Sequence, residues 1–314
     1  MVPTVTGFLP VEELGRVFIH EHVTCADWSM RLAFGERLFP RQTVVDTAVR
    51  QYEDLRRRFG HGAIVDGTPI NLGRDIDLLR EISEGSGMPL LVSTGFYFIE
   101  QPQLLNRGER EIYELLLGEI RDGIDGTGVY PAMIKCAVSR AGFTPLTEKL
   151  LTVAGRLSAE TGLPLFCHTE VALEQGLRAA DIFEAAGADP ALVVMGHSGD
   201  SNDLVYLEKL LARGYWLGMD RFCIADTTNS MENRVRTLLE LHRRGWTNRL
   251  LLAGDRPVYG CFGMTRDPMN LPDATEHYAD IYTQAIPGLS DGGMSADDIE
   301  RMLTDNPRRL FSGL

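Results

Sequence analysis

Residues 164–197 read PLFCHTEVALEQGLRAADIFEAAGADPALVVMGH. Two short apolar runs, Pro164–His168 and Leu192–His197, stand on either side of an amphipathic stretch, Glu174–Ala186. Short runs rich in Val, Leu and Ile are typical of strands that are covered on both faces. The stretch therefore predicts two parallel strands joined by a right-handed crossover through a helix.

The same alternation of strand and helix continues along the whole chain. The other predicted strands are Val17–His20, Ala63–Asp66, Leu90–Thr94, Met133–Cys136, Trp216–Asp220 and Leu250–Asp255. The other predicted helices are Thr43–Phe59, Asp75–Glu84, Glu109–Asp122, Glu148–Glu160, Leu204–Ala212 and Glu232–Arg243. About eight such repeats predict an α/β fold, a TIM (β/α)8 barrel in which residues 1–314 form a single domain. An open, doubly wound sheet is the alternative, but no glycine-rich phosphate loop follows the first strand.

The ends of the predicted elements also fit a barrel. Glycines near the helix ends are expected to be left-handed C-caps: Gly60, Gly162, Gly187, Gly214 and Gly245. After the last strand, Arg256–Pro272 is expected to form a long loop on the face where barrel active sites are built. Asp297–Leu303 then predicts a closing helix, which Asn306-Pro307 is expected to end.

The composition describes an ordinary globular protein with an acidic balance of charge. Hydrophobic residues make up 44% and charged residues 24% of the chain, and the formal net charge is −13. This charge argues against nucleic acid and anionic membranes as partners, because both select basic patches. No apolar run approaches the length of a membrane span, and the first residues lack the regions of a secretory signal. Five scattered cysteines without a C-x-x-C pair suit reduced thiols, so we expect a cytoplasmic protein.

Four of the seven histidines lie at or just after the ends of predicted strands. They are His20 and His22 after the first strand, His168 after the fifth and His197 after the sixth, while Asp255 ends the eighth. The carboxyl ends of barrel strands meet on one rim, and His20 and His22, two residues apart on an extended segment, project to the same side. These five side chains are therefore candidate metal ligands. The other histidines are expected on the surface: His61, His242 and His277.

Lys135 lies in the predicted strand Met133–Cys136, where a charged ammonium is costly to bury. In one interpretation its aliphatic part packs in the strand and its amine reaches the mouth of the barrel. In the other, burial and adjacent metal cations lower its pKa, and the neutral amine reacts with carbon dioxide to give an anionic carbamate that bridges two metals. The balance of charge favours the second interpretation, because an unmodified ammonium would repel the metal ions.

Short motifs follow the predicted strands from one end of the chain to the other. They are Gly7 with Leu14-Gly15-Arg16-Val17-Phe18-Ile19-His20-Glu21-His22, Val65-Asp66 with Leu72-Gly73-Arg74-Asp75, Thr94-Gly95-Phe96-Tyr97, Ile134-Lys135, His168-Thr169, Gly196-His197-Ser198-Gly199-Asp200, Gly218-Met219-Asp220-Arg221 and Asn306-Pro307-Arg308-Arg309. In this combination the chain resembles the phosphotriesterase-related branch of the amidohydrolase superfamily. Each fragment alone would be a weak signal.

The resemblance implies a binuclear metal centre. His20, His22 and Asp255 would hold the buried ion, and His168 and His197 the more exposed one. Carboxylated Lys135 and a hydroxide would bridge the two divalent ions, of which zinc is the first expectation and cobalt, manganese, iron or nickel are alternatives. Relatives of this branch are commonly dimers, so a homodimer is one expectation, although the sequence does not fix the oligomeric state.

Four residues bear on the reaction. Asp255 would act as general base, and Asp200 resembles the family's outer carboxylate in proton relay, unless it is only a helix N-cap before Leu204. Lactonase-like relatives carry an arginine matching Arg221, where phosphotriesterases have a histidine, and a tyrosine matching Tyr97. The simpler interpretations are that Tyr97 packs beside its neighbouring phenylalanines and that Arg221 pairs with Asp220 or Asp226.

The resemblance therefore implies a lactonase that attacks with metal-activated hydroxide. An amidase, a carboxylesterase or a phosphotriesterase on the same site is the alternative, and a barrel without catalytic activity is a third possibility. The sequence departs from the lactonases at Gly254, where they carry histidine, and lacks their tryptophan in the eighth loop. Arg256 and Arg266 are candidate anion contacts there, so the substrate stays open among lactones and related esters or amides.

Overall fold

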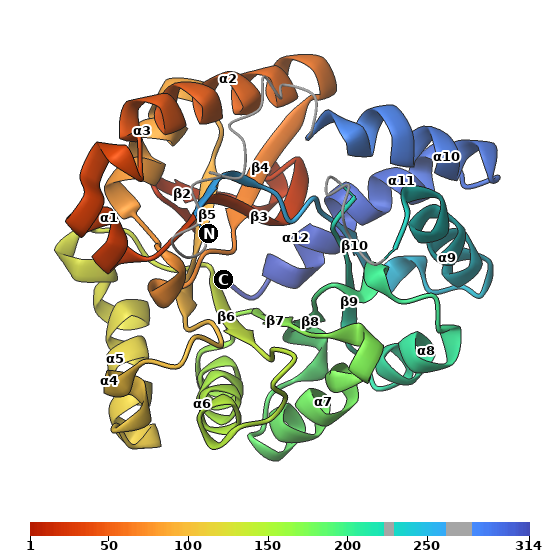
Figure 1. The fold of residues 1–314 in the computed structure, drawn as a ribbon. Coiled ribbons are helices and arrows are strands. Elements are labelled where there is room, and N and C mark those ends of the chain that lie inside the picture. The colour runs from red at the N-terminus through yellow and green to blue at the C-terminus, as the bar shows by residue number, and fades with distance from the viewer. Residues whose placement is uncertain (223–228, 262–277) are drawn as a thin grey trace.

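The computed structural model of the chain describes residues 1–222, 229–261 and 278–314. Asp226, Arg266 and His277, which the sequence analysis singled out, lie outside these residues. Within the described ranges the helices surround a central parallel sheet, as Figure 1 shows. No helix among these residues is long and apolar enough to cross a membrane.

The central sheet has parallel strands in the order β10-β9-β8-β7-β6-β5-β4-β3-β11. Their bounds are β3 (Arg16–Ala26), β4 (His61–Asp66), β5 (Leu90–Gly95), β6 (Met133–Ala137), β7 (Leu165–His168), β8 (Val193–Met195), β9 (Trp216–Met219), β10 (Leu250–Leu252) and β11 (Pro257–Cys261). The sheet closes beside β3, where the Asp255 N–H donates to the His20 carbonyl oxygen at 3.0 Å. β11 then continues alongside the second half of β3, with Pro257 opposite His22. This closed ring is a TIM barrel, as predicted.

The eighth strand therefore has two parts, β10 and β11, separated by residues 253–256. The prediction of an irregular loop over Arg256–Pro272 was wrong for Pro257–Cys261, which pairs with β3. A strand forms there because β3 runs on to Ala26 and offers a free edge beyond β10. Arg256 lies in the short connection, directly after Asp255.

The predicted helices are present with ends within a few residues of the expected ones. They are α2 (Arg41–Phe59), α3 (Ile76–Ser86), α5 (Glu109–Asp122), α6 (Pro145–Thr161), α7 (Gln175–Ala185), α8 (Leu204–Ala212) and α9 (Met231–Arg243). Smaller elements, which the sequence did not indicate, are β1 (Val2–Thr4), β2 (Gly7–Leu9), α1 (Trp28–Phe34), α4 (Pro102–Leu105) and α10 (Ile286–Asp291). Gly60 and Gly162 are left-handed caps, which their lack of a Cβ permits.

The chain ends in a helical segment that passes through Asn306-Pro307. α11 (Ala296–Glu300) leads through a π-helical turn, Arg301–Asp305, into α12 (Asn306–Phe311). The prediction that Asn306-Pro307 ends the helix was therefore wrong. Pro307 lies in the first turn of α12, where a missing N–H is tolerated, and the wider π turn precedes it. The Asn306 side chain is buried and donates to the carbonyl oxygens of Thr247 and Leu250.

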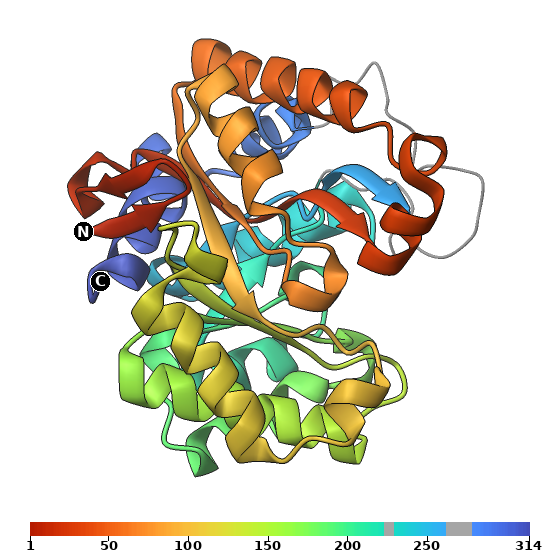
Figure 2. The ribbon, with the colours of Figure 1, turned by 90° about the vertical axis from the view of Figure 1, so that its left-hand side faces the viewer.

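Two apolar cores position the strands. Alternate residues of each strand point into the barrel or outward against the helices. In β7, Phe166 belongs to the interior core and Leu165 and Cys167 to the outer one. In β6, Met133 lies in the interior core and Ile134 in the outer one, so the alternation also directs Lys135 into the barrel. Figure 2 shows both termini at one end of the barrel, with α1 and β11 at the other.

Candidate metal centre

The first two histidines reach the barrel interior because β3 carries a bulge. Phe18 and Glu21 of β3 pair with Ile64 and Asp66 of β4, so three steps along one strand match two along the other. One extra residue changes which side chains face inward. Ile19 fills the interior core, and His20 directly after it also faces inward, with its ring centroid 4.1 Å from that of Phe166.

His20, His22 and Asp255 converge on one point. The Nε2 atoms of both histidines lie 3.3 Å from Asp255 Oδ1, and these three groups are near enough to hold one metal ion. Asp255 lies three residues beyond β10, not within the strand as predicted, and its backbone is left-handed with φ 50°. A positive φ is uncommon for a residue with a side chain, so the closure of the barrel holds Asp255 in place.

His168 and His197 meet on the other side of His20. His168 Nδ1 lies 2.5 Å from His197 Nε2, and the His20 and His197 rings are 5.4 Å apart. Burial is the main cause that holds the pKa of His168 well below its usual range, and the positive charges of Arg221 and Lys135 add to it. Burial is also the main cause that lowers the pKa of His20, to about 3. Both imidazoles are therefore neutral, the form that binds metal.

Lys135 lies among these ligands with only 1% of its surface exposed. Its Nζ is 2.5 Å from His20 Nε2 and 4.1 Å from the centre of the Phe166 ring. Burial lowers its pKa to about 8, although Asp255 and Asp220 oppose the shift. A sizeable fraction of the amine is thus neutral near neutral pH, as a reaction with carbon dioxide requires.

The hydrogen bonds around His22 fix its Nδ1 as a donor and turn its Nε2 toward the centre. The Thr68 hydroxyl donates its hydrogen to Thr24 O at 3.1 Å, so it must accept from His22 Nδ1 at 2.8 Å. Burial disfavours the charged form of His22, but Cys25 and Asp255 outweigh it and raise the pKa of His22 to about 10, so its Nε2 holds a proton toward Asp255, which a metal ion would displace. An imidazole fixed in this way is the usual arrangement for a metal-binding histidine, so the residues present fit a metal ion.

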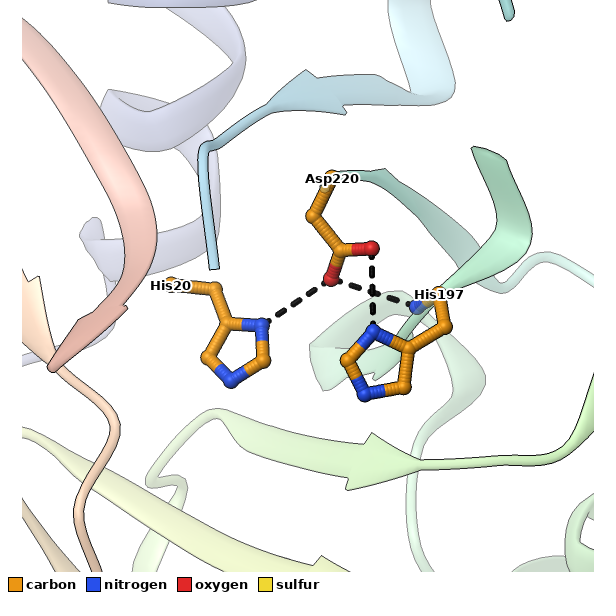
Figure 3. Close-up of side chains that lie close together, drawn as sticks. All are labelled: His20, His197 and Asp220. Atoms are coloured by element: carbon orange, nitrogen blue, oxygen red, sulfur yellow. Dashed lines mark hydrogen bonds and ion pairs between the residues drawn. The ribbon is translucent and has the colours of Figure 1, made fainter. Parts of the chain in front are cut away.

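Asp220 is a functional candidate that the sequence analysis considered only as a partner of Arg221. It follows β9 and is fully buried, with Oδ2 2.9 Å from His20 Nδ1 and Oδ1 3.1 Å from His197 Nδ1 (Figure 3). Burial alone would raise the pKa of Asp220, but His197 and His20 outweigh it and hold this pKa well below the usual range. The same rule that identified Asp255, an acid at the end of a predicted strand, would have identified Asp220.

Arg221 joins Asp255 to Asp200. Its Nε donates to Asp255 Oδ2 at 2.9 Å and its Nη1 to Asp200 Oδ2 at 2.6 Å, and buried Arg234 also donates to Asp200. Desolvation opposes the charge of Arg221, yet Asp255 and Asp200 raise its pKa above the ordinary value. Asp200 is not the N-cap of α8, because Asp203 accepts from Val205 N and Tyr206 N. The simpler interpretation paired Arg221 with Asp220 or Asp226, but its guanidinium forms salt bridges with Asp255 and Asp200.

Tyr97 packs in its loop and also lies beside the candidate metal site. Its ring lies 4.2 Å from that of Phe98, and its hydroxyl lies 3.2 Å from His168 Nδ1. Its backbone N–H donates to the Asn71 side chain, which holds the loop after β5. The phenol therefore lies directly beside the candidate metal ligands.

Glu21 is a second residue whose role the sequence did not reveal. Its two carboxylate oxygens accept from the backbone N–H groups of Gly254, at 2.5 Å, and Arg256, at 3.0 Å. These residues flank Asp255, so Glu21 ties the loop that carries Asp255 to the strand that carries His20 and His22. Burial raises the pKa of Glu21 to about 8, against the effect of the two N–H donors.

His61 is also buried, at 2% exposure, so the prediction of a surface position was wrong. It is the first residue of β4, at the end of the strand opposite to the rim that carries the candidate ligands. Its Nε2 accepts from Phe18 N–H, and its Nδ1 lies 2.7 Å from the Tyr282 hydroxyl. This histidine completes the hydrogen bonds between β3 and the C-terminal segment.

Together, the closed barrel and the cluster on its rim define a TIM-barrel protein with a histidine-rich candidate metal site. The sequence model of the Phosphotriesterase family matches residues 1–311, and the chain belongs to this family. Relatives named as hydrolases are among those it resembles. The chain is 29% identical to the aryldialkylphosphatase of Saccharolobus solfataricus, with 96% of each chain covered. It is 25% identical to the human N-acetyltaurine hydrolase, over 99% of this chain and 97% of the relative. The solved structure of the phosphotriesterase from Mycobacterium tuberculosis matches with a TM-score of 0.91 and 30% identity, over 99% of this chain and 98% of that one.

Proposed function

We propose that this hydrolase uses two divalent metal ions and opens a lactone ring. The observation that carries the proposal is the convergence of four imidazoles, one carboxylate and a buried lysine at the carboxyl end of the barrel. The proposed metal ligands are His20, His22, Lys135, His168, His197 and Asp255. Carboxylation of Lys135 would give the anion that joins the two ions.

A metal pair supplies activation of water and polarisation of the scissile carbonyl group. The donor set of imidazoles and carboxylates accepts several ions, with zinc as the first choice and cobalt, manganese, iron or nickel as alternatives. The protein's own residues then orient the substrate and move the proton.

Asp255 is the proposed general base, and Arg221 decides where its proton can go. The guanidinium contacts both Asp255 and Asp200 but is always protonated, so it cannot pass a proton from one to the other. A proton taken up by Asp255 is instead returned to the leaving oxygen. The alkoxide released from a lactone needs that proton, whereas the stable phenolate released from an aryl phosphotriester does not. In this proposal Asp200 and Arg234 position Arg221.

Tyr97 is the proposed substrate contact. Its hydroxyl lies beside His168, and burial raises its pKa above the ordinary value, so it remains a hydrogen-bond donor. A neutral phenol at the edge of the centre can donate to the carbonyl or ring oxygen of a lactone. Phosphotriester cleavage is then expected only as a weak side activity.

Amide hydrolysis is the second candidate, because the chain is similar along its whole length to an N-acetyltaurine hydrolase. An amine leaving group also needs a proton, so the contacts of Arg221 do not separate amides from lactones. Arg256, directly after Asp255, is the candidate contact for an anionic group on either kind of substrate.

Metal analysis and a substrate panel test the proposal. The purified protein is expected to hold two divalent ions per chain, and an excess of chelator should abolish activity that zinc, cobalt or manganese restores. The restored enzyme is then assayed on lactones, N-acyl amino acids and paraoxon-like triesters. Strong turnover of amides without lactone cleavage would favour the second candidate, and absence of metal would contradict both.

A further inference from the structure

We propose that Asp220 is a positioning residue that fixes the tautomer of one histidine in each half of the metal centre. The inference rests on the proposed metal centre and adds a residue that is not one of its ligands. In the proposed centre His20 would hold one ion and His197 the other, and Asp220 lies between these two histidines (Figure 3). A single side chain would thereby support ligands of both ions.

The two oxygens of Asp220 have different partners. Oδ1 lies 3.1 Å from His197 Nδ1. Oδ2 lies 2.9 Å from His20 Nδ1 and also accepts the backbone N–H of His197, at 3.2 Å. An ionised carboxylate can only accept hydrogen bonds, so both imidazoles must carry their hydrogen on Nδ1. Their Nε2 lone pairs then face Lys135 and His168, which lie on the metal side of the rings.

The surroundings of Asp220 keep it in this position. Its carbonyl oxygen accepts from Nη1 of buried Arg234 at 2.9 Å. A side chain at Gly199 would stand 3.0 Å from that same oxygen, so this glycine permits the close approach of the two loops. Asp220 itself has no exposed surface. Its carboxylate cannot turn away from the histidines without leaving a buried charge unpaired.

Because Oδ1 and Oδ2 of Asp220 have different partners, Asp220→Asn should affect the tautomers of His20 and His197 differently. The amide has one oxygen that accepts and one nitrogen that donates. The oxygen should take the place of Oδ2, where two N–H groups point, and the amide nitrogen the place of Oδ1. The amide nitrogen then donates a hydrogen bond to His197 Nδ1, so Nδ1 must act as the acceptor. The hydrogen of this ring therefore moves to Nε2, and the Nε2 lone pair that would bind the metal ion is lost. His20 keeps its tautomer.

The experiment compares the wild type, Asp220→Asn and a matched control, Asp203→Asn. Asp203 caps α8, and asparagine caps a helix equally well. Metal-free proteins labelled with 15N in histidine report the tautomers by NMR, and the reconstituted proteins report metal per chain after dialysis against a weak chelator. For Asp220→Asn we expect His197 with hydrogen on Nε2, His20 unchanged, and one retained ion in place of two. Loss of a hydrogen-bond partner of a metal-binding histidine typically weakens metal binding about 10- to 100-fold.

Two outcomes would overturn the inference. In one, Asp220→Asn keeps both ions and both Nδ1–H tautomers; in the other, His20 changes and His197 does not. If Asp220→Asn does not fold, the metal-free wild type decides, because an Nε2–H tautomer at His20 or His197 contradicts the assignment. A wild type that binds no metal defeats the proposed function, whereas its NMR spectrum still tests the role of Asp220.

Discussion

Lys135 illustrates how one position in a strand changes the chemistry of a side chain. The alternation of β6 turns it into the barrel, and burial there lowers its pKa to about 8. The neutral amine can then capture carbon dioxide, whereas a lysine on the protein surface remains protonated at the same pH.

Metal uptake by the metal-free protein should therefore depend on bicarbonate. We expect wild-type protein reconstituted in buffer free of carbon dioxide to regain activity much more slowly than in bicarbonate, and Lys135→Ala to regain neither metal nor activity in either buffer. Metal content and activity are measured together over time. Lys209→Ala, at an exposed position of α8, serves as a control and should behave like the wild type. Full activity of Lys135→Ala would contradict the bridging role.

Tyr97 offers a test of substrate contact at the scale of a single oxygen atom. Tyr97→Phe keeps the ring against Phe98 and removes the hydroxyl beside His168. Loss of one hydrogen bond of about 1.4 kcal/mol in the transition state predicts about a tenfold fall in kcat/KM for lactones. Metal content should not change. An unaltered kcat/KM would show that the tyrosine only packs in the loop.

At the scale of elements, the junction between β3 and the divided eighth strand holds the centre together. Glu21 accepts two backbone N–H groups on either side of Asp255. In Glu21→Gln one of these donors would face an amide nitrogen, which should cost about 1–3 kcal/mol of unfolding free energy. The variant should also bind the buried ion more weakly, because Asp255 loses its support.

Urea unfolding and metal content measure both effects. The control is Glu111→Gln, since Glu111 also accepts a backbone N–H, from Gly108, but on an exposed surface. We expect the control to lose less than about 0.5 kcal/mol. Equal stability of wild type and Glu21→Gln would show that the carboxylate does not hold the Asp255 loop.

The elements also show what sequence reasoning could and could not predict. The helix ends and most strands followed from apolar periodicity and glycine caps, and the rim histidines from their place after strands. The bulge in β3 could not be predicted, because it depends on pairing with β4. The same holds for β11, whose partner is the far end of β3, and for the contacts of Glu21 with residues 254 and 256. These features arise from long-range pairing that no local pattern encodes.

At the scale of the whole molecule, buried His61 should make stability depend on pH. Burial lowers its pKa from 6.5 to about 3, and its Nε2 accepts a backbone hydrogen bond. Between these values the unfolded chain binds more protons, so stability is lost as the pH falls below 6.5. At about 1.4 kcal/mol per pH unit, His61 should remove about 2 kcal/mol between pH 6.5 and pH 5.

The unfolding free energies of wild type and His61→Gln at pH 7 and pH 5 test this. Comparing the loss between the two pH values cancels the contribution of the metal ligands, which both proteins share. The loss should be about 2 kcal/mol smaller in His61→Gln. Identical losses would mean that His61 becomes protonated in the folded state without a penalty.

The division of the eighth strand has a consequence for how the protein is made. β3 emerges early in synthesis, but its outer edge stays unpaired until residues 250–261 arrive near the end of the chain. Long-range strand pairing of this kind is slow and leaves an edge open to aggregation. During synthesis, His20 and His22 are thus present before their partner Asp255. The proposed buried ion can be bound in its final geometry only after residues 250–261 have paired with β3.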